Sequence, residues 1–307
     1  KKKTSQHNPE QKMKNNLPEI RRKKLKELLN SKKIVRVMEV SNGLSGLIVE
    51  NTKVCNKEYD AMWLSSLCDS TLKGKPDNEV VDFSSRVKTI EEIFEVTTKP
   101  LIVDGDTGGK TEHFVYNVKT LERLGVSAII IEDKKGLKQN SLLGDSAVQI
   151  LEDKEVFANK IKQGKNVLQT DDFMIIARIE SFIAGNDLSD ALDRAYYYVE
   201  SGADGIMIHS YKNDGKEIIE FLKCFREKYP NIPVVLVPTT YSSYTETELY
   251  NNGANIIIYA NHLLRSAYKN MVNVAKKILK DERSLEASEE YCVSMKEILG
   301  LIGDDND

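Results

Sequence analysis

Short runs of apolar, mostly β-branched residues recur along the chain, and longer stretches with a helical period of apolar residues separate them. Runs such as IIIE, MIIAR, VVLVP and NIIIYA are apolar at nearly every position, which is typical of parallel strands covered on both faces. The pattern predicts eight strands, at Ile34–Val40, Ala61–Ser65, Leu101–Asp104, Ala128–Glu132, Phe173–Arg178, Gly205–His209, Val234–Pro238 and Asn255–Tyr259.

The segments between these strands carry helical periodicity. It predicts helices at Glu79–Glu95, Lys119–Leu124, Ala191–Ser201, Gly215–Glu227 and Leu263–Leu279. Glycines such as Gly125 stand at expected helix ends, where a left-handed residue costs little, and Asp187 or Ser189 can cap the helix that begins near Asp190. Eight such units predict a closed (β/α)8 barrel of about 250 residues. A doubly wound open sheet is the alternative, but the first strand lacks the G-x-G-x-x-G turn of dinucleotide-binding sheets.

Composition narrows the class of protein. The chain has 307 residues, with 44 Lys and Arg against 47 Asp and Glu, so charge does not favour a nucleic-acid surface over the whole molecule. No apolar run approaches the roughly 18 residues of a membrane span, and no signal peptide is evident. We therefore expect a soluble, cytoplasmic protein without nucleic-acid or membrane partners, whose four cysteines are reduced thiols.

Charge is distributed unevenly. Residues 1–36 hold ten Lys and three Arg against three Glu. We expect three regions: a disordered basic lead-in or linker at residues 1–20, a single barrel with C-terminal assembly helices at 21–303, and an acidic tail at 304–307. Because the first residue is Lys rather than Met, we expect that the chain has either lost upstream residues or been cut from a longer protein.

Ionisable residues follow the predicted strands repeatedly, and in a barrel the carboxyl ends of the strands line one mouth. Asp104, Asp106 and Glu132 are oxygen donors of the kind that suits Mg²⁺ or Mn²⁺. Arg178 can hold a carboxylate or phosphoryl oxygen in a forked geometry, and backbone N–H groups at Ser66 and Leu67 could hold an anion. This equipment suits an anionic carboxylate substrate that reacts through an enolate.

One segment of the sequence is specific. Glu132-Asp133-Lys134, five residues and then Asn140-Ser141 resembles the mutase signature of the phosphoenolpyruvate mutase/isocitrate lyase superfamily. The lyases of that superfamily carry a catalytic cysteine in this loop, whereas no cysteine lies between Cys68 and Cys224 here. The resemblance runs from about Lys33 to Leu301 and includes Met38-Glu39, Asn42–Ser45, Asp104–Gly108, Ala177–Glu180, Phe182–Gly185, His209-Ser210, Val237–Thr239 and Ala260–His262. Two positions depart from the family pattern: Ser66 replaces a common Gly, and Gly109-Lys110 replaces an aromatic residue and Gly.

The resemblance implies roles for individual residues. Asp104 is expected to bind Mg²⁺ directly, and Asp106, Glu132 and Asp77 to hold its water ligands. The backbone of Ser66 and Leu67 is expected to hold the substrate carboxylate. The groups expected around the phosphoryl group are Arg178, His209, Asn140 and Ser65. Trp63 is expected to wall the pocket, and a gating loop with Lys138, Asn140 and Ser141 to close over the substrate.

The activity that the resemblance implies is Mg²⁺-dependent interconversion of phosphoenolpyruvate and phosphonopyruvate, an isomerisation that forms a C–P bond and opens phosphonate biosynthesis. Dissociative transfer and covalent transfer through a carboxylate such as Asp77 both stay open. The alternative is a phosphonopyruvate hydrolase, which would differ mainly in the gating loop. A carbon–carbon lyase and a non-catalytic barrel are more distant alternatives.

The resemblance also implies partners. It indicates a homotetramer, built as a dimer of dimers with the last barrel helix exchanged between subunits, and Leu285–Leu301 is the candidate exchanged or docking segment. A nucleotidyltransferase, fused or separate, is a further partner expected from the family.

Overall fold

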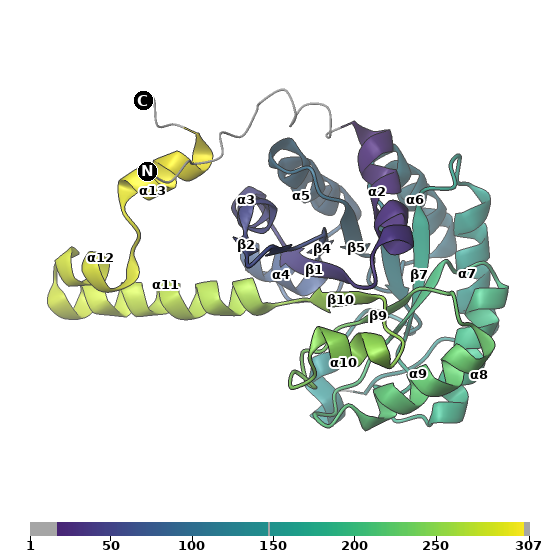
Figure 1. The fold of residues 1–307 in the computed structure, drawn as a ribbon. Helices are drawn as coiled ribbons and strands as arrows, with labels where there is room; N and C mark the ends of the chain where they lie inside the picture. The colour runs from purple at the N-terminus through teal and green to yellow at the C-terminus, as the bar shows by residue number, and fades with distance from the viewer. Residues whose placement is uncertain (1–16, 147, 304–307) are drawn as a thin grey trace. The chain divides into compact units, whose positions relative to one another are not determined.

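A computed structural model of the chain describes residues 17–146 and 148–303, and these residues form two compact units that divide at Ala260 and Asn261. In the first unit, eight parallel strands close into a barrel in the order β1-β10-β9-β8-β7-β6-β5-β4 (Figure 1). The strands are β1 (Val35–Val40), β4 (Ala61–Leu64), β5 (Leu101–Asp104), β6 (Ala128–Glu132), β7 (Met174–Ile179), β8 (Gly205–Ile208), β9 (Val234–Leu236) and β10 (Ile256–Tyr259). The predicted (β/α)8 barrel is therefore confirmed, and each predicted strand lies within about two residues of an observed one.

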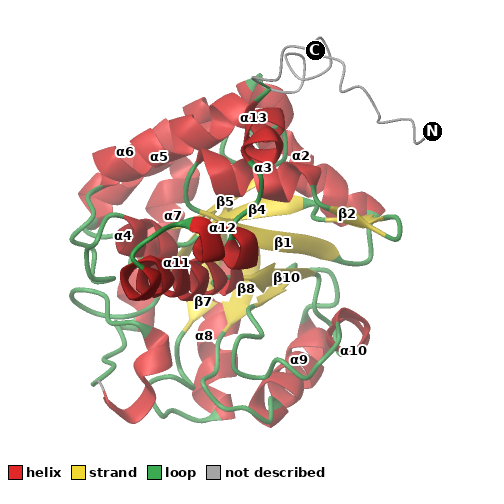
Figure 2. Cartoon of the chain, turned by 90° about the vertical axis from the view of Figure 1, so that its left-hand side faces the viewer, coloured by secondary structure: helices red, strands yellow, loops and turns green. Residues whose placement is uncertain are grey.

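Helices surround these strands, which occupy the centre of the view in Figure 2. The helices of the barrel unit are α2 (Pro18–Ser31), α3 (Gly43–Asn51), α4 (Ser66–Leu72), α5 (Phe83–Val96), α6 (Thr111–Leu124), α7 (Lys154–Asn166), α8 (Leu188–Glu200), α9 (Lys216–Lys228) and α10 (Glu246–Asn251). A 3-10 turn, η1 (Ser141–Ser146), lies in the loop after β6, and β2 (Lys53–Val54) pairs with β3 (Lys57–Glu58) in a small hairpin.

Helices α5 and α6 begin at residues other than those that the sequence pattern predicts. Helix α5 begins at Phe83 rather than near Glu79, because the Asp82 carboxylate accepts the Ser85 N–H and so caps the helix there. Helix α6 begins at Thr111, eight residues before the predicted Lys119, and its first turn carries the polar Thr111, Glu112 and His113, which hide the apolar period. Its end is as predicted, at Gly125 in the left-handed region with φ of 94°.

The barrel interior is filled by apolar side chains, and α2 contributes to this core. Leu25 is fully buried in the cluster that contains Val35, Val37 and Ile256, and Leu28 and Leu29 pack against it. Helix α2 begins at Pro18, two residues before the expected end of the basic lead-in at residue 20. Residues 1–16 of that lead-in and the acidic tail 304–307 lie outside the described residues.

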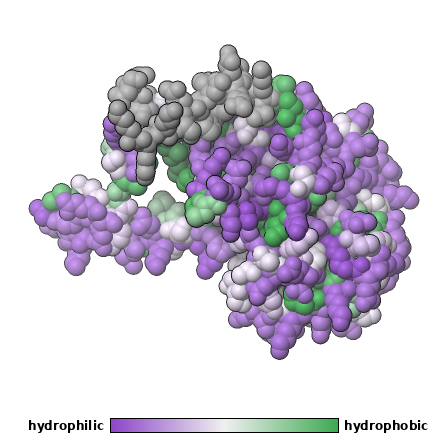
Figure 3. Space-filling view, in the orientation of Figure 1, coloured by the Kyte–Doolittle hydropathy of each residue, from purple (hydrophilic) through white to green (hydrophobic). Residues whose placement is uncertain are grey.

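The second unit consists of α11 (His262–Asp281), α12 (Leu285–Tyr291) and α13 (Met295–Ile302). Within this unit α11 has no buried residue, and Tyr268, Met271, Leu279 and Met295 are at least 70% exposed. In the part of the chain that the structure describes, no helix combines the length and apolarity needed to cross a membrane. The face of the barrel unit seen in Figure 3 is mainly hydrophilic, with scattered apolar residues.

Candidate active site

Two carboxylates lie at the end of β5, where the chain makes a tight turn against β6. The Oδ2 of Asp104 accepts hydrogen bonds from the Ser66 N–H at 3.0 Å and the Ser66 hydroxyl at 2.7 Å. Between the two carboxylates stands Gly105, where a Cβ would come within 2.7 Å of the Ile129 side chain, so only glycine fits without a shift. Asp106 adopts a φ of 54°, a left-handed conformation that is uncommon for residues other than glycine and gathers at functional sites.

The third predicted metal residue, Glu132, ends β6 next to Arg178 of β7. The two residues are register partners, and Arg178 Nη1 lies 3.3 Å from Glu132 Oε2, while Lys134 Nζ lies 3.5 Å from Oε1. Glu132 is 1% exposed, and neither of its carboxylate oxygens receives a hydrogen bond within the described chain. Buried carboxylate oxygens without a hydrogen-bond donor are suited to accept hydrogen bonds from the water ligands of a metal ion.

The burial of these acids shapes their charge. Burial raises the pKa of Glu132 to about 7, and the neighbouring Arg178, Lys138 and Lys134 reduce that rise. Burial also raises the pKa of Asp106, with Asp104 adding to the rise and Lys138 opposing it. At Asp104 burial again favours the protonated form, but Lys138, Arg178 and the two Ser66 hydrogen bonds outweigh it, so this pKa lies below its usual range. Asp104 therefore stays ionised at neutral pH.

This donor set fits Mg²⁺ in one particular way. Within residues 17–146 and 148–303, no three His, Cys, Asp or Glu side chains are grouped closely enough to hold a metal ion by themselves. Magnesium usually keeps several waters and takes one or two carboxylates directly. Asp104 supplies one ionised carboxylate, and Asp106 and the Glu132 oxygens that accept no hydrogen bond could hold water ligands. This arrangement agrees with the usual coordination of Mg²⁺.

Arg178 and His209 both contact the carboxylate of Glu180, which lies two residues after Arg178. Glu180 accepts hydrogen bonds from the Arg178 Nε and, at 2.7 Å, from the Ser141 hydroxyl. The His209 Nδ1 lies 3.2 Å from Glu180 and 3.0 Å from the Arg178 Nη2. Burial and then Arg178 lower the pKa of His209, while Glu180 partly offsets this, so the imidazole is neutral at pH 7. Arg178 stays charged, because the surrounding carboxylates raise its pKa against the effect of burial.

The loop after β6 lies over this centre. The Ser141 hydroxyl receives hydrogen bonds from Arg178 Nη2 at 2.7 Å and from Lys134 Nζ at 2.9 Å. Asn140 Nδ2 donates to Asp77 Oδ2 at 2.8 Å, and the Lys138 ammonium lies among Ser66, Asp77, Asp104 and Asp106. Lys138 and Ser141 are 3% and 2% exposed, so these two side chains of the loop are buried at the ends of the barrel strands.

Three predicted residues lie at the margin of this network. Trp63 on β4 is 3% exposed and belongs to the apolar core cluster of the barrel. The Ser65 hydroxyl accepts the Cys68 N–H and caps α4. Leu67 is the second residue of α4, so its N–H belongs to the first turn, whose N–H groups have no acceptor within the helix. The Ser66 N–H already bonds Asp104, so an incoming carboxylate at this turn would share that donor.

Some contributors had no assigned role in the sequence. Glu180 lies one residue beyond the end of β7 and two residues after Arg178, and this spacing of two was a usable signal that both side chains share a face. Glu79 offered no such signal: it accepts hydrogen bonds from Thr107 N and Oγ1 with one oxygen and from Lys138 N with the other. Arg86 of α5, the helix before β5, donates a hydrogen bond of 3.1 Å to the Asp104 carbonyl, and only the tertiary structure reveals this contact.

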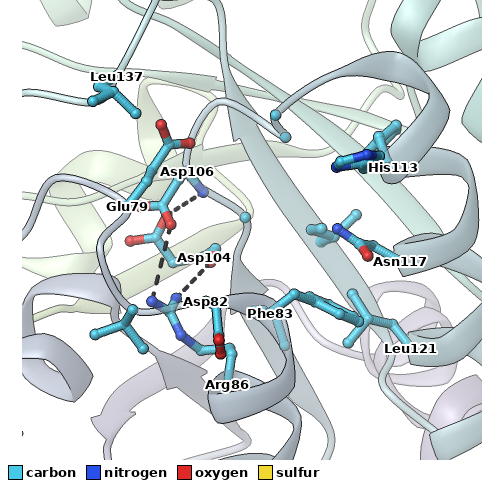
Figure 4. Close-up of a pocket in the computed structure, with 17 residues that line it drawn as sticks. Glu79, Asp82, Phe83, Arg86, Asp104, Asp106, His113, Asn117, Leu121 and Leu137 are labelled. Carbon is cyan, nitrogen blue, oxygen red and sulfur yellow. Dashed lines mark hydrogen bonds and ion pairs between the residues drawn. The ribbon is translucent and has the colours of Figure 1, made fainter.

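A cavity of about 330 Å³ lies beside Asp104 and Asp106, between α5 and α6. Figure 4 shows Asp104, Asp106, Glu79 and Arg86 together on one side of it and His113 and Asn117 of α6 on the other. Its inner wall is apolar, with Val103, Phe114, Leu121 and Ile129. The cavity therefore adjoins the site from outside the strand barrel.

Comparison with known proteins decides the family. The family model described as phosphoenolpyruvate phosphomutase matches residues 25–279. The chain belongs to the phosphoenolpyruvate phosphomutase family. It is 35% identical to a phosphoenolpyruvate phosphomutase of Tetrahymena pyriformis, over 92% of this chain and 91% of that protein.

Solved structures of phosphoenolpyruvate phosphomutase family relatives have the same fold. A phosphoenolpyruvate phosphomutase from Streptomyces platensis subsp. rosaceus superimposes with a TM-score of 0.84 at 32% identity, covering 91% of this chain and 94% of that one. A phosphonopyruvate hydrolase in complex with oxalate and Mg²⁺ gives a TM-score of 0.82 at 32% identity, covering 94% and 95%. The family and its fold are thus confirmed, and the mutase and hydrolase structures are equally similar to this chain in sequence identity.

Proposed function

We propose that this protein is an isomerase that interconverts phosphoenolpyruvate and phosphonopyruvate with Mg²⁺ as cofactor. One observation carries the choice of isomerase over hydrolase: the Asn140-Ser141 pair of the mutase signature is docked into the site. Ser141 bonds both Arg178 and Glu180, and Asn140 bonds Asp77. A loop held in this way keeps water from the transferring group, and hydrolysis is the competing reaction that water would cause.

The chain's own groups can support the transfer. Arg178 presents a charged fork, and neutral His209 and the Asn140 amide are further polar groups for the phosphoryl oxygens. Spreading the phosphoryl charge over such groups is the main requirement of a loose, metaphosphate-like transition state. Asp77 is paired with the Lys138 ammonium and accepts a hydrogen bond from the Asn140 amide. A carboxylate held by these two contacts is a poor nucleophile for the phosphoryl group, so we favour the dissociative path.

Mg²⁺ would be held by Asp104, with Asp106, Glu132 and Asp77 around its waters. When bound, the ion stabilises the negative charge that develops on the carboxylate and enolate oxygens. The relative crystallised with oxalate and Mg²⁺ supports this cofactor. Chelation should abolish activity, and added Mg²⁺ should restore it; activity that persists in chelator would contradict the metal assignment.

We further propose assembly as a homotetramer, a dimer of dimers that exchanges its last barrel helix, in support of a cytoplasmic phosphonate pathway with a nucleotidyltransferase as a later partner. The exposed apolar residues Tyr268, Met271 and Leu279 of α11 support a protein contact on this helix. Light scattering that finds only monomers would refute the assembly.

A coupled assay on phosphonopyruvate tests the activity. Lactate dehydrogenase and NADH alone report pyruvate, the product of a hydrolase. Pyruvate kinase and ADP added to the same mixture report phosphoenolpyruvate, the product of the isomerase. We expect NADH oxidation only in the second mixture; an equal rate in the first would establish the hydrolase.

A further inference from the structure

Lys138 occupies an uncommon position for a loop lysine. Its ammonium lies 2.9 Å from Asp106 Oδ1, 3.4 Å from Asp77 Oδ1 and 3.5 Å from Asp104 Oδ2. It also donates a hydrogen bond to the Ser66 hydroxyl, and the residue is only 3% exposed. One ammonium therefore sits at the centre of three carboxylates, in the position that a small cation surrounded by oxygens would take.

The rest of the loop is tied to this position. The Lys138 N–H donates to Glu79 Oε2 at 3.2 Å, and the same Glu79 carboxylate accepts a hydrogen bond from the hydroxyl of Thr107, in the loop after β5. Asn140 follows Lys138 by two residues and Ser141 by three, so the ammonium, the amide and the hydroxyl dock as one segment. Moving Lys138 out of the carboxylates must strain or release these neighbouring contacts.

We propose that Lys138 is a built-in competitor of the divalent cation, so that the docked lysine and a bound metal exclude each other. The proposal rests on the metal assignment in the proposed function and adds an order of events to it. Both cations need the oxygens of Asp104 and Asp106, and two positive charges a few ångströms apart inside a buried site repel strongly. Metal binding would displace the Lys138 ammonium from these carboxylates and release the loop segment that docks with it.

Simultaneous binding of the metal and the docked lysine would give a different experimental result. If Lys138 were only a neighbouring counter-ion, metal and lysine would share the carboxylates and the loop would stay docked when metal binds. The two arrangements differ in whether metal changes the protection of the loop backbone, a property of the wild-type protein that needs no variant and no turnover.

Two measurements test the proposal. Hydrogen–deuterium exchange over residues 134–146 of the full-length wild type should speed up as Mn²⁺ is titrated in without substrate. Mn²⁺ affinity, measured by electron paramagnetic resonance, should be about tenfold tighter in Lys138→Met because a like charge has been removed from the site. Lys135→Met removes a charge from the same loop, but Lys135 is exposed and its backbone N–H, not its side chain, bonds Ile150, so its affinity should match the wild type.

Different results would contradict the competition between lysine and metal and the metal site itself. Metal binding that leaves exchange of residues 134–146 unchanged, or equal affinities in Lys138→Met and Lys135→Met, would overturn the competition while leaving the metal site in place. Failure of the wild type and both variants to bind Mn²⁺ would overturn the metal assignment itself, and the competition with it.

Discussion

Asn140 Nδ2 donates a hydrogen bond of 2.8 Å to Asp77 Oδ2, and this contact joins the loop after β6 to the segment after α4, 63 residues apart in sequence. The other side of Asp77 faces the Lys138 ammonium at 3.4 Å. The amide and the ammonium of one loop therefore clamp a single carboxylate at the barrel mouth.

Replacing Asn140 with alanine should abolish isomerisation while leaving the fold intact. The amide is lost both as a donor to the phosphoryl group and as the tie to Asp77, and the loss of one such donor costs about 10²–10³ in kcat. Steady-state kinetics and circular dichroism check the two halves of this prediction, and wild-type turnover in the variant would remove the main reason for preferring the isomerase.

The barrel and the charged residues at its strand ends followed from sequence because they depend on local pattern, whereas Asp77, Lys138, Asn140 and Ser141 were expected only from the family resemblance. Continuous apolar runs such as those of β6 and β7 predict parallel strands, and parallel strands bring their end residues to one mouth, so Glu132 and Arg178 could be placed at the same mouth in advance. The structure adds that they are register partners. Contacts that depend on the path of loops could not be placed in this way. The hydrogen bonds that Glu79 accepts from Thr107 and Lys138 depend on the path of the segment before α5, and a sequence pattern carries no record of them.

Helix beginnings were the weaker part of the fold prediction, for a related reason. At α6 the polar first turn conceals the helical period, and at α5 the cap at Asp82 overrides the period that continues back to Glu79. The hydrogen bond of the Asp82 cap decides the boundary at α5, whereas α6 begins without a side-chain cap.

Glu180 should act as a positioning residue for Arg178 and His209. Glu180→Gln keeps the volume but removes the charge that faces both groups, and we expect a loss of about 10–100-fold in activity, as for other residues that orient functional groups. The imidazole ¹⁵N shifts of His209 should change as well, which a purely structural effect on folding would not produce. Glu200→Gln, at an exposed glutamate that pairs with Lys228, is the control and should change neither property.

Stability should depend on pH through Glu132. Burial raises its pKa from 4.5 to about 7, so the folded protein binds this proton more tightly than the unfolded chain does. The stabilisation is therefore fully present below pH 4.5 and is lost as the pH rises through about 7. In chelator, Glu132→Gln should flatten this part of the dependence of the urea midpoint on pH; an unchanged slope would show that the proton belongs to another group.

Tyr198 should stabilise the fold through a buried carboxylate behind the site. Its hydroxyl donates to Asp133 Oδ2 at 2.7 Å, and Asp133 Oδ1 accepts the Glu180 N–H at 2.9 Å. Tyr198→Phe removes one donor from a fully buried carboxylate and should lower the free energy of unfolding by about 1–3 kcal/mol. Tyr197→Phe, at the half-buried neighbour on the same helix, should change it by less than about 0.5 kcal/mol in the same urea titration.

The fate of the phosphorus atom tests the central claim most directly. Phosphonopyruvate incubated with the protein and Mg²⁺ is followed by ³¹P NMR in one tube, where the phosphonate, phosphoenolpyruvate and inorganic phosphate give separate resonances. We predict conversion of the phosphonate signal into that of phosphoenolpyruvate, since equilibrium favours the enol phosphate. Growth of the inorganic phosphate signal instead, with pyruvate released, would contradict the isomerase and assign the site to hydrolysis.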